Sequence, residues 1–552
     1  MPLTNIGATI CASAERYPDA LALAAPQPDG DYRTFTFAEL ERTTNRLASA
    51  LVERGVTPGM RVALLVPPSG EFIALVFALF KTGAVIILID PGMGRQNLAK
   101  CLSEAEPEAM VGIPLAHVAR LVLRHRFPKI RLNVTVGRRW LWGGPTLKDL
   151  LDEGRDDFRP AANDATDPAA IIFTSGSTGP PKGVLYRHVN FLHQVSEIQQ
   201  RYGIEPGEVD LPGFPLFGLF NAAMGVSTII PQMDATRPAQ VDPRKILPAL
   251  ERWNVTHSFG SPAMWNTISR YCQQEGVRLK TLRRVFSAGA PVPVHLLQRM
   301  VSVLPSGAEM HTPYGATEAL PVATISAAEV LSETCQRSAR GAGTCVGTRF
   351  PGIEWKIVRI SDGPLPNLSD CDPLPTGEVG ELIVSGAVVT SEYVTRRESN
   401  AVAKIAEGQR IWHRMGDVGY VDQQDRFWFC GRKAHRVQTA DGVMYSVPCE
   451  AIFNQHPRIY RSALVGTGSL GQQQPAVICE PWPEHRPSDA GDERRLLDEL
   501  HELGQLHPLT HRIARSRIVW QRALPVDIRH NAKISREQLA AWAEDHLPKS
   551  DK

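Results

Sequence analysis

Between residues 60 and 91 the sequence alternates short, wholly apolar runs with a helix-length segment, and this alternation limits the possible fold more than any other feature. Residues 62–66 and 84–89 are continuous apolar runs, and residues 71–81 between them are long enough for a helix. A strand that is apolar on both faces needs cover on both faces, which a parallel sheet flanked by helices provides. Further runs of this kind lie at residues 169–173, 255–259 and 284–287. The sequence therefore predicts a large α/β body with parallel, helix-covered sheets.

The sequence changes character from about residue 352, and this change predicts further, smaller units. Residues 355–358 and 381–384 are short alternating runs between Gly and Pro turns, which indicates antiparallel strands in a small β-rich subdomain. The last 120 residues suggest two helices, one with four leucines on one face over residues 494–503, and one starting at Ser535, which forms a capping-box pattern with Gln538. We expect a body over residues 1–432 and a small, mobile α+β domain over residues 433–552.

Composition excludes several classes of protein. Lys and Arg number 60 against 58 Asp and Glu, and the net charge of +2 gives no electrostatic case for a nucleic-acid partner. The longest unbroken apolar run, residues 72–80, is far shorter than the ~20 residues of a membrane span. The sequence starts without a signal-like segment, and its nine cysteines are scattered without a CxxC pair. We therefore expect a cytoplasmic protein with reduced thiols.

Residues 171–183, with the sequence IIFTSGSTGPPKG, are the most informative stretch for function. An apolar strand is followed by small and hydroxyl residues and then by Lys182. Glycines let backbone N–H groups face an anion, hydroxyls donate to phosphate oxygens, and the lysine adds positive charge. The spacing differs from the GxxxxGKS/T pattern of P-loop NTPases, because Gly183 follows Lys182. We predict a phosphate-binding loop of another kind, in preference to a flexible Gly/Ser turn.

This loop resembles the phosphate loop of the adenylate-forming (AMP-binding) superfamily, which includes acyl-CoA synthetases, peptide-synthetase adenylation domains and firefly luciferase. Four further motifs follow in the superfamily's order: YGATE at residues 314–318, WHRMGD at 412–417, GRK at 431–433, and Lys533 at the position of its C-terminal catalytic lysine. The resemblance extends from about residue 34 to Lys533. It implies the superfamily's fold, with a large body of several subdomains and a small mobile C-terminal domain.

The resemblance implies ATP-dependent activation of a carboxylate, with Mg²⁺. Lys533 would bridge the carboxylate and the α-phosphate, Thr317 would touch the α-phosphate, and Glu318 would hold the metal. The other implied nucleotide ligands are Thr174, Ser175, Gly176, Ser177, Thr178, Gly179 and Lys182 at the phosphates, Gly289, Ala290, Pro291, Tyr314 and its neighbour Gly315 around the adenine, and Asp417 with Arg432 at the ribose. Phe214, Phe217 and Gly218 would line the acyl pocket.

Simpler interpretations exist for several of these residues. Taken alone, Asp417 also suits a loop turn, Tyr314 a core aromatic, and Lys533 a solvated surface lysine. His413 and His435 are candidate bases, although a structural role is the better interpretation of each. A GxGxxG pattern at residues 466–471 is followed by a strand-like run and not by a helix, so we interpret it as a hairpin turn.

Positions that the superfamily associates with a coenzyme A step depart from its pattern here. The hinge motif has Ala434 in place of an aspartate, Ala532 replaces the glycine before Lys533, and Gly218 stands in the acyl-pocket motif where a histidine usually follows. Since the adenylation residues are intact, we expect a second step without an external thiol. The β-hydroxyl of the acyl adenylate would attack its own carbonyl and give a β-lactone and AMP.

Residues 412–420 and 430–437 resemble one branch of the superfamily, the β-lactone synthetases of bacterial long-chain olefin biosynthesis. That branch implies ATP and a long-chain 2-alkyl-3-hydroxy fatty acid as substrates. A long-chain acyl-CoA ligase and a non-catalytic acyl- or nucleotide-binding paralogue are the alternatives. Retained Glu318, Asp417 and Lys533 argue against the second of these.

Residues 120–139 contain seven basic residues and no acidic one, with aromatic residues close by. A solvated basic face is the simpler interpretation. The functional alternative is docking to an anionic membrane surface, or to a partner enzyme of the olefin pathway that hands on an insoluble substrate.

Overall fold

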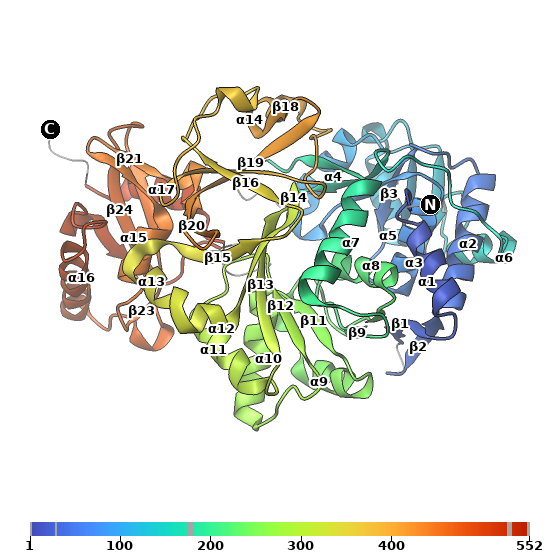
Figure 1. Cartoon of the computed structure of the whole chain (residues 1–552), viewed down its shortest axis with the longest axis horizontal. Coiled ribbons are helices and arrows are strands. Elements are labelled where there is room, and N and C mark those ends of the chain that lie inside the picture. Colours follow the sequence, from blue (N-terminus) through green and yellow to red (C-terminus); the bar gives the residue numbers. More distant parts are fainter. Residues whose placement is uncertain (1–2, 28–29, 175–179, 527–532, 549–552) are drawn as a thin grey trace.

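A computed structural model describes residues 3–27, 30–174, 180–526 and 533–548 of the chain (Figure 1). A six-stranded sheet in the N-terminal part has the order β6-β5-β3-β4-β7-β8, and only β8 runs antiparallel to its neighbour. Its strands are β3 (Arg61–Leu65), β4 (Val85–Leu88), β5 (Ala109–Gly112), β6 (Leu132–Thr135), β7 (Pro168–Phe173) and β8 (Gly183–Arg187). The predicted parallel, buried strands are confirmed.

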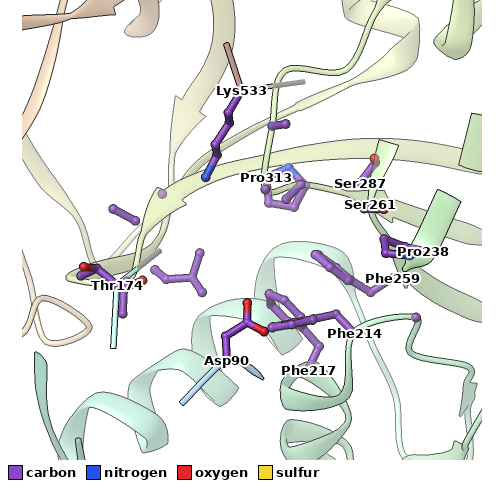
Figure 2. Close-up of a pocket in the computed structure, with 18 of the residues that line it drawn as sticks. Asp90, Thr174, Phe214, Phe217, Pro238, Phe259, Ser261, Ser287, Pro313 and Lys533 are labelled. Carbon is purple, nitrogen blue, oxygen red and sulfur yellow. The ribbon is translucent and has the colours of Figure 1, made fainter. Parts of the chain in front are cut away.

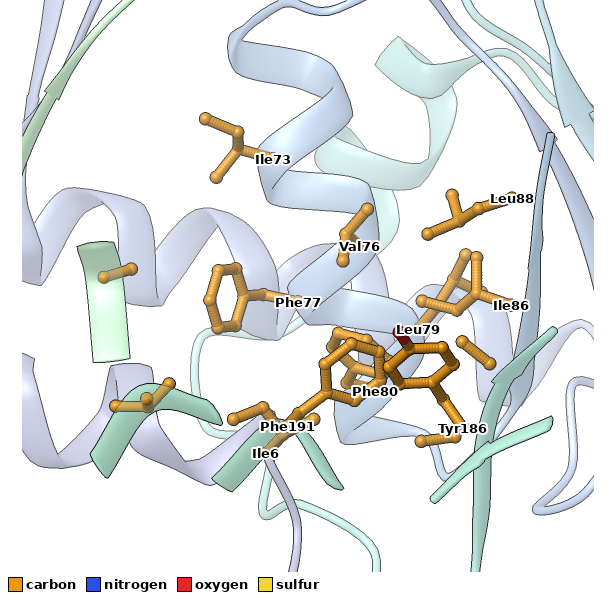
Figure 3. Packing of buried hydrophobic residues seen from close by; sticks show 14 of the residues in the cluster. Ile6, Ile73, Val76, Phe77, Leu79, Phe80, Ile86, Leu88, Tyr186 and Phe191 are labelled. Carbon is orange, nitrogen blue, oxygen red and sulfur yellow. The ribbon is translucent and has the colours of Figure 1, made fainter. Parts of the chain in front are cut away.

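The helix predicted between β3 and β4 is α3 (Gly70–Lys81), and it is buried on all sides. Its start is fixed by Ser69, whose hydroxyl accepts a hydrogen bond from the Phe72 amide. Figure 3 shows Phe77, Phe80 and their neighbours on α3 packing against residues of β4, β8 and α7 (His188–Tyr202). Lys81 at the end of α3 is fully buried, and its Nζ donates to Glu41, Thr44 and Asn45 of α2 (Phe37–Glu53).

A second, 14-stranded sheet forms the rest of the body. Its strands β9 (Val209–Asp210), β10 (Ser227–Ile229), β11 (His257–Gly260), β12 (Arg284–Ser287) and β13 (Glu309–Ala316) pair in parallel, and β10 also pairs in parallel with β1 (Leu21–Pro26). β11 starts two residues later than predicted, because the Val255 amide donates to the Leu250 carbonyl and closes the preceding helix. The predicted strand at residues 284–287 is confirmed.

The sheet continues with antiparallel pairs, which begin at β14 and so earlier than the predicted residue 352. These strands are β14 (Ala319–Ser326), β15 (Thr344–Arg349), β16 (Glu354–Val358), β17 (Gly380–Ser385), β18 (Lys404–Glu407), β19 (Arg410–Val421) and β20 (Arg426–Arg432), with β2 (Tyr32–Thr36) at the opposite edge. The remaining helices of the body are α1 (Ala8–Arg16), α4 (Arg95–Glu104), α5 (Pro114–Val122), α6 (Leu147–Glu153), α8 (Pro215–Met224), α9 (Pro243–Arg252), α10 (Pro262–Glu275), α11 (Val294–Val303), α12 (Ala327–Glu329), α13 (Cys335–Arg337) and α14 (Asn400–Ala403).

The C-terminal elements lie at the end of the molecule opposite the N-terminus (Figure 1). They comprise the ribbon β21 (Val437–Thr439) and β22 (Gly442–Met444), the sheet β23 (Ile459–Thr467), β24 (Gln474–Pro481) and β25 (Ile518–Trp520), and the helices α15 (Ser446–Phe453), α16 (Ala490–Gln505) and α17 (Arg536–His546). The GxGxxG segment lies between antiparallel β23 and β24, so the predicted hairpin turn is confirmed. The boundary at residue 432 stays a prediction.

Both predicted C-terminal helices exist, but one detail is wrong. Leu496, Leu497 and Leu500 of α16 are buried as expected. Ser535 is the N-cap of α17, yet its side chain makes no capping hydrogen bond, so the predicted capping box does not form. The start of α17 is held instead by Arg536, whose guanidinium donates to both carboxylate oxygens of Glu450. Within the described parts of the chain, none of the helices is long and apolar enough to span a membrane.

Candidate active site

A large cavity of about 2160 Å³ brings together most of the residues predicted from the motifs. It is lined by the carboxyl ends of parallel strands in both sheets, where ligands of α/β proteins commonly bind, and by residues of α15 and of the segment before α17. The predicted residues that line it are Thr174, Lys182, Phe214, Phe217, Gly289, Ala290, Pro291, Tyr314, Gly315, Thr317, Glu318, Asp417, Arg432 and Lys533. Ser175, Gly176, Ser177, Thr178 and Gly179 lie outside the described residues.

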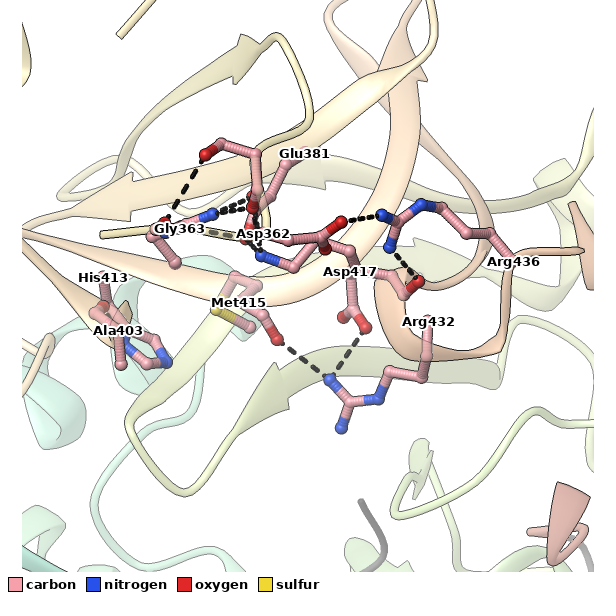
Figure 4. A network of polar contacts seen from close by, with 12 residues as sticks. Asp362, Gly363, Glu381, Ala403, His413, Met415, Asp417, Arg432 and Arg436 are labelled. Carbon is pink, nitrogen blue, oxygen red and sulfur yellow. Dashed lines mark hydrogen bonds and ion pairs between the residues drawn. The ribbon is translucent and has the colours of Figure 1, made fainter. Parts of the chain in front are cut away.

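The corner predicted for the ribose is built around Asp417 on β19. Asp417 lies opposite Arg432 in the β19–β20 pair, and Arg432 Nη1 donates to Asp417 Oδ1 at 2.8 Å and to the Met415 carbonyl at 2.9 Å (Figure 4). The Tyr314 hydroxyl donates to the other carboxylate oxygen. Burial raises the pKa of Asp417, and Arg432 opposes that rise. The carboxylate is thus fixed from two sides, with lone pairs remaining to accept hydroxyl groups of a ligand.

Two glycines shape the neighbouring wall for geometric reasons. Gly289 follows β12 and has φ of +92°, a left-handed conformation that other residues rarely adopt. A Cβ on Gly315 would lie 2.7 Å from the Ala319 carbonyl oxygen, so a side chain there would block the tight β13–β14 connection. The backbone of this wall therefore requires both glycines, and its role as the adenine site stays a prediction.

Thr174 and Lys182 flank the predicted phosphate loop and contact each other. The Thr174 amide donates to the Lys182 carbonyl at 3.0 Å, and the Lys182 amide donates to Thr174 Oγ1 at 3.1 Å. Lys182 Nζ lies 5.1 Å from the centre of the Tyr393 ring, in the range of a cation–π contact. The Lys182 side chain therefore belongs to one cluster with Tyr393.

Glu318, the predicted metal ligand, is held from both its ends. The Tyr393 hydroxyl donates to Glu318 Oε1 at 2.6 Å, while the amide and the hydroxyl of Thr390 both donate to the Glu318 carbonyl at 2.9 Å. The adjacent Thr317 carbonyl accepts from the Tyr186 hydroxyl at 2.6 Å. A fixed carboxylate beside a phosphate loop is the donor that suits Mg²⁺, which usually takes one or two carboxylates plus phosphate oxygens.

Tyr393 and Lys404 belong to this cluster and were missed by sequence reasoning. Lys404 Nζ donates to the Thr390 carbonyl at 2.5 Å and lies 5.6 Å from the Tyr393 ring centre. Burial lowers the pKa of Lys404 to about 7, although Glu318 and Glu392 favour its charged form. The only signal in the sequence was a lysine within a short apolar run at the start of β18, which is too common to single out.

Lys533 projects its amino group into the cavity (Figure 2). The following residue, Ile534, pairs with Val526 in an isolated bridge, and α17 begins two residues later with the Arg536–Glu450 ion pair. Glu450 belongs to α15 and also accepts from the Leu464 amide at 2.9 Å. The lysine is thus positioned by contacts among the C-terminal elements, whereas Asn531 and Ala532 before it lie outside the described residues.

A buried ionic cluster adjoins the predicted hinge. Arg414 donates to both oxygens of the fully buried Glu381, at 3.1 and 2.6 Å, and Lys433 Nζ donates to the same two oxygens at 3.0 Å (Figure 4). Arg436 pairs with Asp362 on the neighbouring loop. Separating one partner would leave a buried charge unpaired, so this cluster fixes the chain on both sides of Ala434.

The two candidate bases have different surroundings. His413 is buried and does not line the cavity; its Nδ1 lies 3.1 Å from the Ala403 carbonyl oxygen, and burial holds its pKa well below the ordinary value. His435 lines the cavity, but its Nε2 lies 3.0 Å from Glu537 Oε1 on α17. Burial also lowers the pKa of His435.

Aromatic side chains line the end of the cavity predicted for the acyl group. Phe217 stacks on Phe259 with ring centres 3.8 Å apart, and Phe214 lies 5.6 Å from Phe217 (Figure 2). Gly218 is not among the lining residues. A Cβ there would lie 3.1 Å from Pro212 Cγ and 3.3 Å from Thr228 Cγ2, so Gly218 allows α8 to pack closely against its neighbours.

The basic stretch at residues 120–139 is partly paired. Lys129 forms an ion pair with Glu106 at 3.0 Å, and Arg131 forms one with Glu108 at 2.8 Å. Arg124, Arg126, Arg138 and Arg139 are exposed. The nearby Trp142 is buried and stacks on His117 of α5, so it is a core residue.

Fold and site together define an adenylate-forming enzyme. Residues 11–394, more than half of the chain, match the AMP-binding enzyme family. The chain therefore belongs to that ATP-using family. It is 44% identical over 553 residues to the olefin beta-lactone synthetase of Xanthomonas campestris pv. campestris, covering 98% of both chains. It is 45% identical over 561 residues to the olefin beta-lactone synthetase of Stenotrophomonas maltophilia, covering 99% of both.

Among solved structures, the anthranilate CoA ligase AuaEII in complex with anthranoyl-AMP is similar in fold. The TM-score is 0.78 at 19% identity, and the match covers 99% of this chain and 98% of that one. The predicted family and adenylate-forming fold are therefore confirmed, and so is the prediction that the chain is an AMP-forming enzyme.

Proposed function

We propose that this chain is an ATP-dependent β-lactone synthetase that acts on a long-chain 2-alkyl-3-hydroxy fatty acid in olefin biosynthesis. One observation carries the proposal: a single cavity joins the nucleotide residues to an aromatic, apolar acyl end, with Lys533 reaching into it. The near full-length identity to two olefin beta-lactone synthetases supports the same reaction. It favours this proposal over a long-chain acyl-CoA ligase.

ATP would bind with its ribose hydroxyls donating to Asp417 and its adenine beside Gly289, Ala290, Pro291 and Tyr314. Lys182 and Thr174, with the five loop residues between 174 and 180, would hold the β- and γ-phosphates. Glu318 would hold Mg²⁺, which when bound neutralises phosphate charge. The fixed geometry of Glu318 and Asp417 would reduce the ordering cost of binding.

In the first step a carboxylate oxygen attacks the α-phosphorus and the bond to the β-phosphate oxygen breaks, so pyrophosphate leaves. Lys533 would contact the carboxylate and the α-phosphate, where negative charge must be stabilised as the two anions meet. Thr317 would touch the α-phosphate. Electrostatic stabilisation by groups already in position is the main contribution that such a site makes.

In the second step the β-hydroxyl oxygen attacks the acyl carbonyl carbon and the bond to AMP breaks. The products are the β-lactone, AMP and one proton. Because the nucleophile belongs to the substrate itself, the chain has to fold the substrate and exclude water. The apolar lining around Phe214 and Phe217 would do both.

Location and partners belong to this proposal as well. We place the enzyme in the cytoplasm, without a nucleic-acid partner. Its exposed arginines at residues 124, 126, 138 and 139 would contact other enzymes of the pathway or an anionic membrane surface. Loss of either complex formation or lipid binding on neutralising three of these arginines would support the assignment, and no change in both would refute it.

The decisive assay omits coenzyme A. We expect the protein with ATP, Mg²⁺ and a 2-alkyl-3-hydroxy acid to release pyrophosphate and AMP and to form a β-lactone. The matched control is the same acid without its hydroxyl, which should yield pyrophosphate and an acyl adenylate but no lactone. An absolute requirement for coenzyme A would identify an acyl-CoA ligase, and no pyrophosphate under any condition would identify a binding protein.

A further inference from the structure

The cavity has a second apolar region that the proposed reaction has not yet used. Its volume of about 2160 Å³ is larger than the ~300–1,000 Å³ of most small-molecule pockets. One part of its lining is the aromatic group Phe214, Phe217 and Phe259 at α8 and β11, which we call the α8 arm. Besides this arm and the residues proposed for the nucleotide, the lining includes a set of residues on α4, α5 and the segments next to them. This set, the α5 arm, comprises Met93, Leu98, Ala99, Leu102, Ile113, Leu115, Ala116, Ala119, Arg120, Val122, Leu123 and Phe127.

The α5 arm starts at the edge where the parallel strands of the six-stranded sheet end. Val66, Ile89 and Ile113 follow directly after β3, β4 and β5, and all three line the cavity. Asp90, the next residue after Ile89, lines the same cavity as Phe214 of the α8 arm (Figure 2). The two arms are therefore continuous, and they meet at the end of β4.

Helix α5 presents one face to this arm. The residues of α5 that line the cavity are Leu115, Ala116, Ala119, Arg120 and Val122. They are adjacent or three or four positions apart, as residues on one helix face are. His117 lies on the other side, where its Nε2 is 3.0 Å from the Val134 carbonyl oxygen of β6. The helix thus closes the arm with a face of small and aliphatic side chains.

The lining of the α5 arm suits hydrocarbon. Arg120 is its one charged residue among those that the structure describes, and Arg120 Nε is buried without a hydrogen-bond partner. Leu115 and Val122 line the cavity and are 69% and 73% exposed, so the arm opens to solvent at α5. An open apolar channel accommodates a chain whose end extends beyond the protein, without a fixed limit on its length.

We propose that the α5 arm binds the 2-alkyl branch of the substrate, while the α8 arm binds the chain at carbon 3. This inference rests on the proposed function, because only an acid with two chains needs two arms. The chains leave adjacent carbon atoms, so they can diverge from one point near the carboxylate held by Lys533. Phe214 and Phe217 of the α8 arm are the residues that the acyl-pocket motif predicts, so we assign the chain at carbon 3 to this arm. The α5 arm is then left for the branch.

The test narrows the arm in the otherwise unchanged enzyme. Ala119 is exposed and lies at the mouth, so Ala119→Trp adds bulk there without crowding the free protein. The matched control is Leu121→Trp, on the same helix but outside the cavity lining, with the native side chain 43% exposed. Pyrophosphate release is measured with two 3-hydroxy acids that differ only in the 2-substituent, methyl or long alkyl.

We expect Ala119→Trp to lower kcat/KM for the long-branched acid by about tenfold or more and to leave the 2-methyl acid within about twofold of wild type. Leu121→Trp should resemble wild type with both acids. The 2-methyl acid reports a folded active site in each variant. Equal effects of Ala119→Trp on both acids, or none on either, would overturn the proposal. Because pyrophosphate reports adenylation alone, it tests the arm even if no lactone forms, and a missing lactone would count against the proposed function only.

Discussion

The two ends of the cavity are built in opposite ways. At the end proposed for the nucleotide, each carboxylate is fixed by a hydrogen bond from a tyrosine. Tyr314 donates to Asp417, and Tyr393 donates to Glu318. At the acyl end, the lining is a set of aromatic and aliphatic side chains such as Phe217 that contact one another mainly through their apolar surfaces. A ligand at the nucleotide end would be positioned by hydrogen bonds and charges in fixed directions. A ligand at the acyl end would be positioned by the shape of the apolar lining.

This difference determines what a substitution does. The hydrogen bonds and charges at the nucleotide end act on the same atoms in every substrate. Removing one of these polar groups should therefore lower the rate for every acid. Shape acts through the area it covers, so a change at the acyl end should lower the rate for some acids and not for others. The comparison fails if substitutions at the acyl end also lower the rate equally for all acids.

Lys533→Ala should have the largest effect, because it removes the cation that we propose contacts both the carboxylate and the α-phosphate. We expect kcat for pyrophosphate release to fall by roughly 10²–10³-fold with every acid, the usual loss when one stabilising group of this kind is removed. ATP affinity, measured by calorimetry, should remain close to wild type. Lys280→Ala, an exposed lysine that pairs with Glu251, is the control. Unchanged turnover of Lys533→Ala would refute its role.

Asp417→Ala should have the next largest effect, confined to the nucleotide end. Arg432 and Tyr314 would each lose a partner in a buried site, and the ribose hydroxyls would lose their acceptor. We expect the KM for ATP to rise by about tenfold or more, with about 1–3 kcal/mol lost in the free energy of unfolding from the unpaired groups. Steady-state kinetics and thermal unfolding with and without ATP would measure both. If the KM for the acid rises as much as that for ATP, the two ends are not separate.

The contrast also explains which parts of the site could be predicted from the sequence. The residues that we propose for nucleotide binding lie in short contiguous motifs, since one strand end or loop carries several at once. Glu318 and Asp417 could therefore be proposed from the motifs alone. Lys404 could not be predicted, because its significance comes from burial beside Tyr393, and neither residue lies within a motif. The parallel strands could be predicted because their apolar runs reflect local periodicity.

Predictions that depended on packing were less accurate. The motif places Gly218 in the lining of the acyl pocket, but this glycine instead allows close packing of α8 on Pro212 and Thr228. Ser535 marks the start of α17, yet the guanidinium of Arg536 anchors that helix to Glu450, a residue 86 positions earlier. The α5 arm is assembled from α4, α5 and three strand ends, so no single stretch of sequence contains it. Tertiary contacts between distant segments decide these features.

Phe217→Ala should show the selective effect expected of the acyl end. The substitution removes the ring that stacks on Phe259 and widens the α8 arm. An aromatic contact contributes about 0.5–1.5 kcal/mol beyond its buried area, so we expect kcat/KM to fall roughly tenfold for long-chain acids and much less for short ones. The KM for ATP is the internal control and should not change. A uniform loss across chain lengths would show that Phe217 acts on the reaction centre and not on the shape of the arm.

Lys404→Met should act on the pH dependence of stability. Burial lowers the pKa of Lys404 from 10.5 to about 7, so the unfolded chain binds more protons than the folded chain between these two values. The stability of the folded chain therefore rises with pH across that window. The destabilisation caused by burying the charged Lys404 is fully present below pH 7 and absent above about pH 10.5. One proton limits this slope to about 1.4 kcal/mol per pH unit.

The measurement is urea unfolding of Lys404→Met and wild type from pH 6.5 to 9.5. The variant should be more stable at the acidic end, and its advantage should shrink as the pH rises, because wild-type Lys404 loses its charge. Lys280→Met, at an exposed position, should show a constant difference from wild type. An advantage of Lys404→Met that does not vary with pH would mean that the ammonium group stays charged in the folded enzyme. Lys404 would then be a permanent cation of the nucleotide end, held by the Thr390 carbonyl and Tyr393 in the same manner as the other directed contacts there.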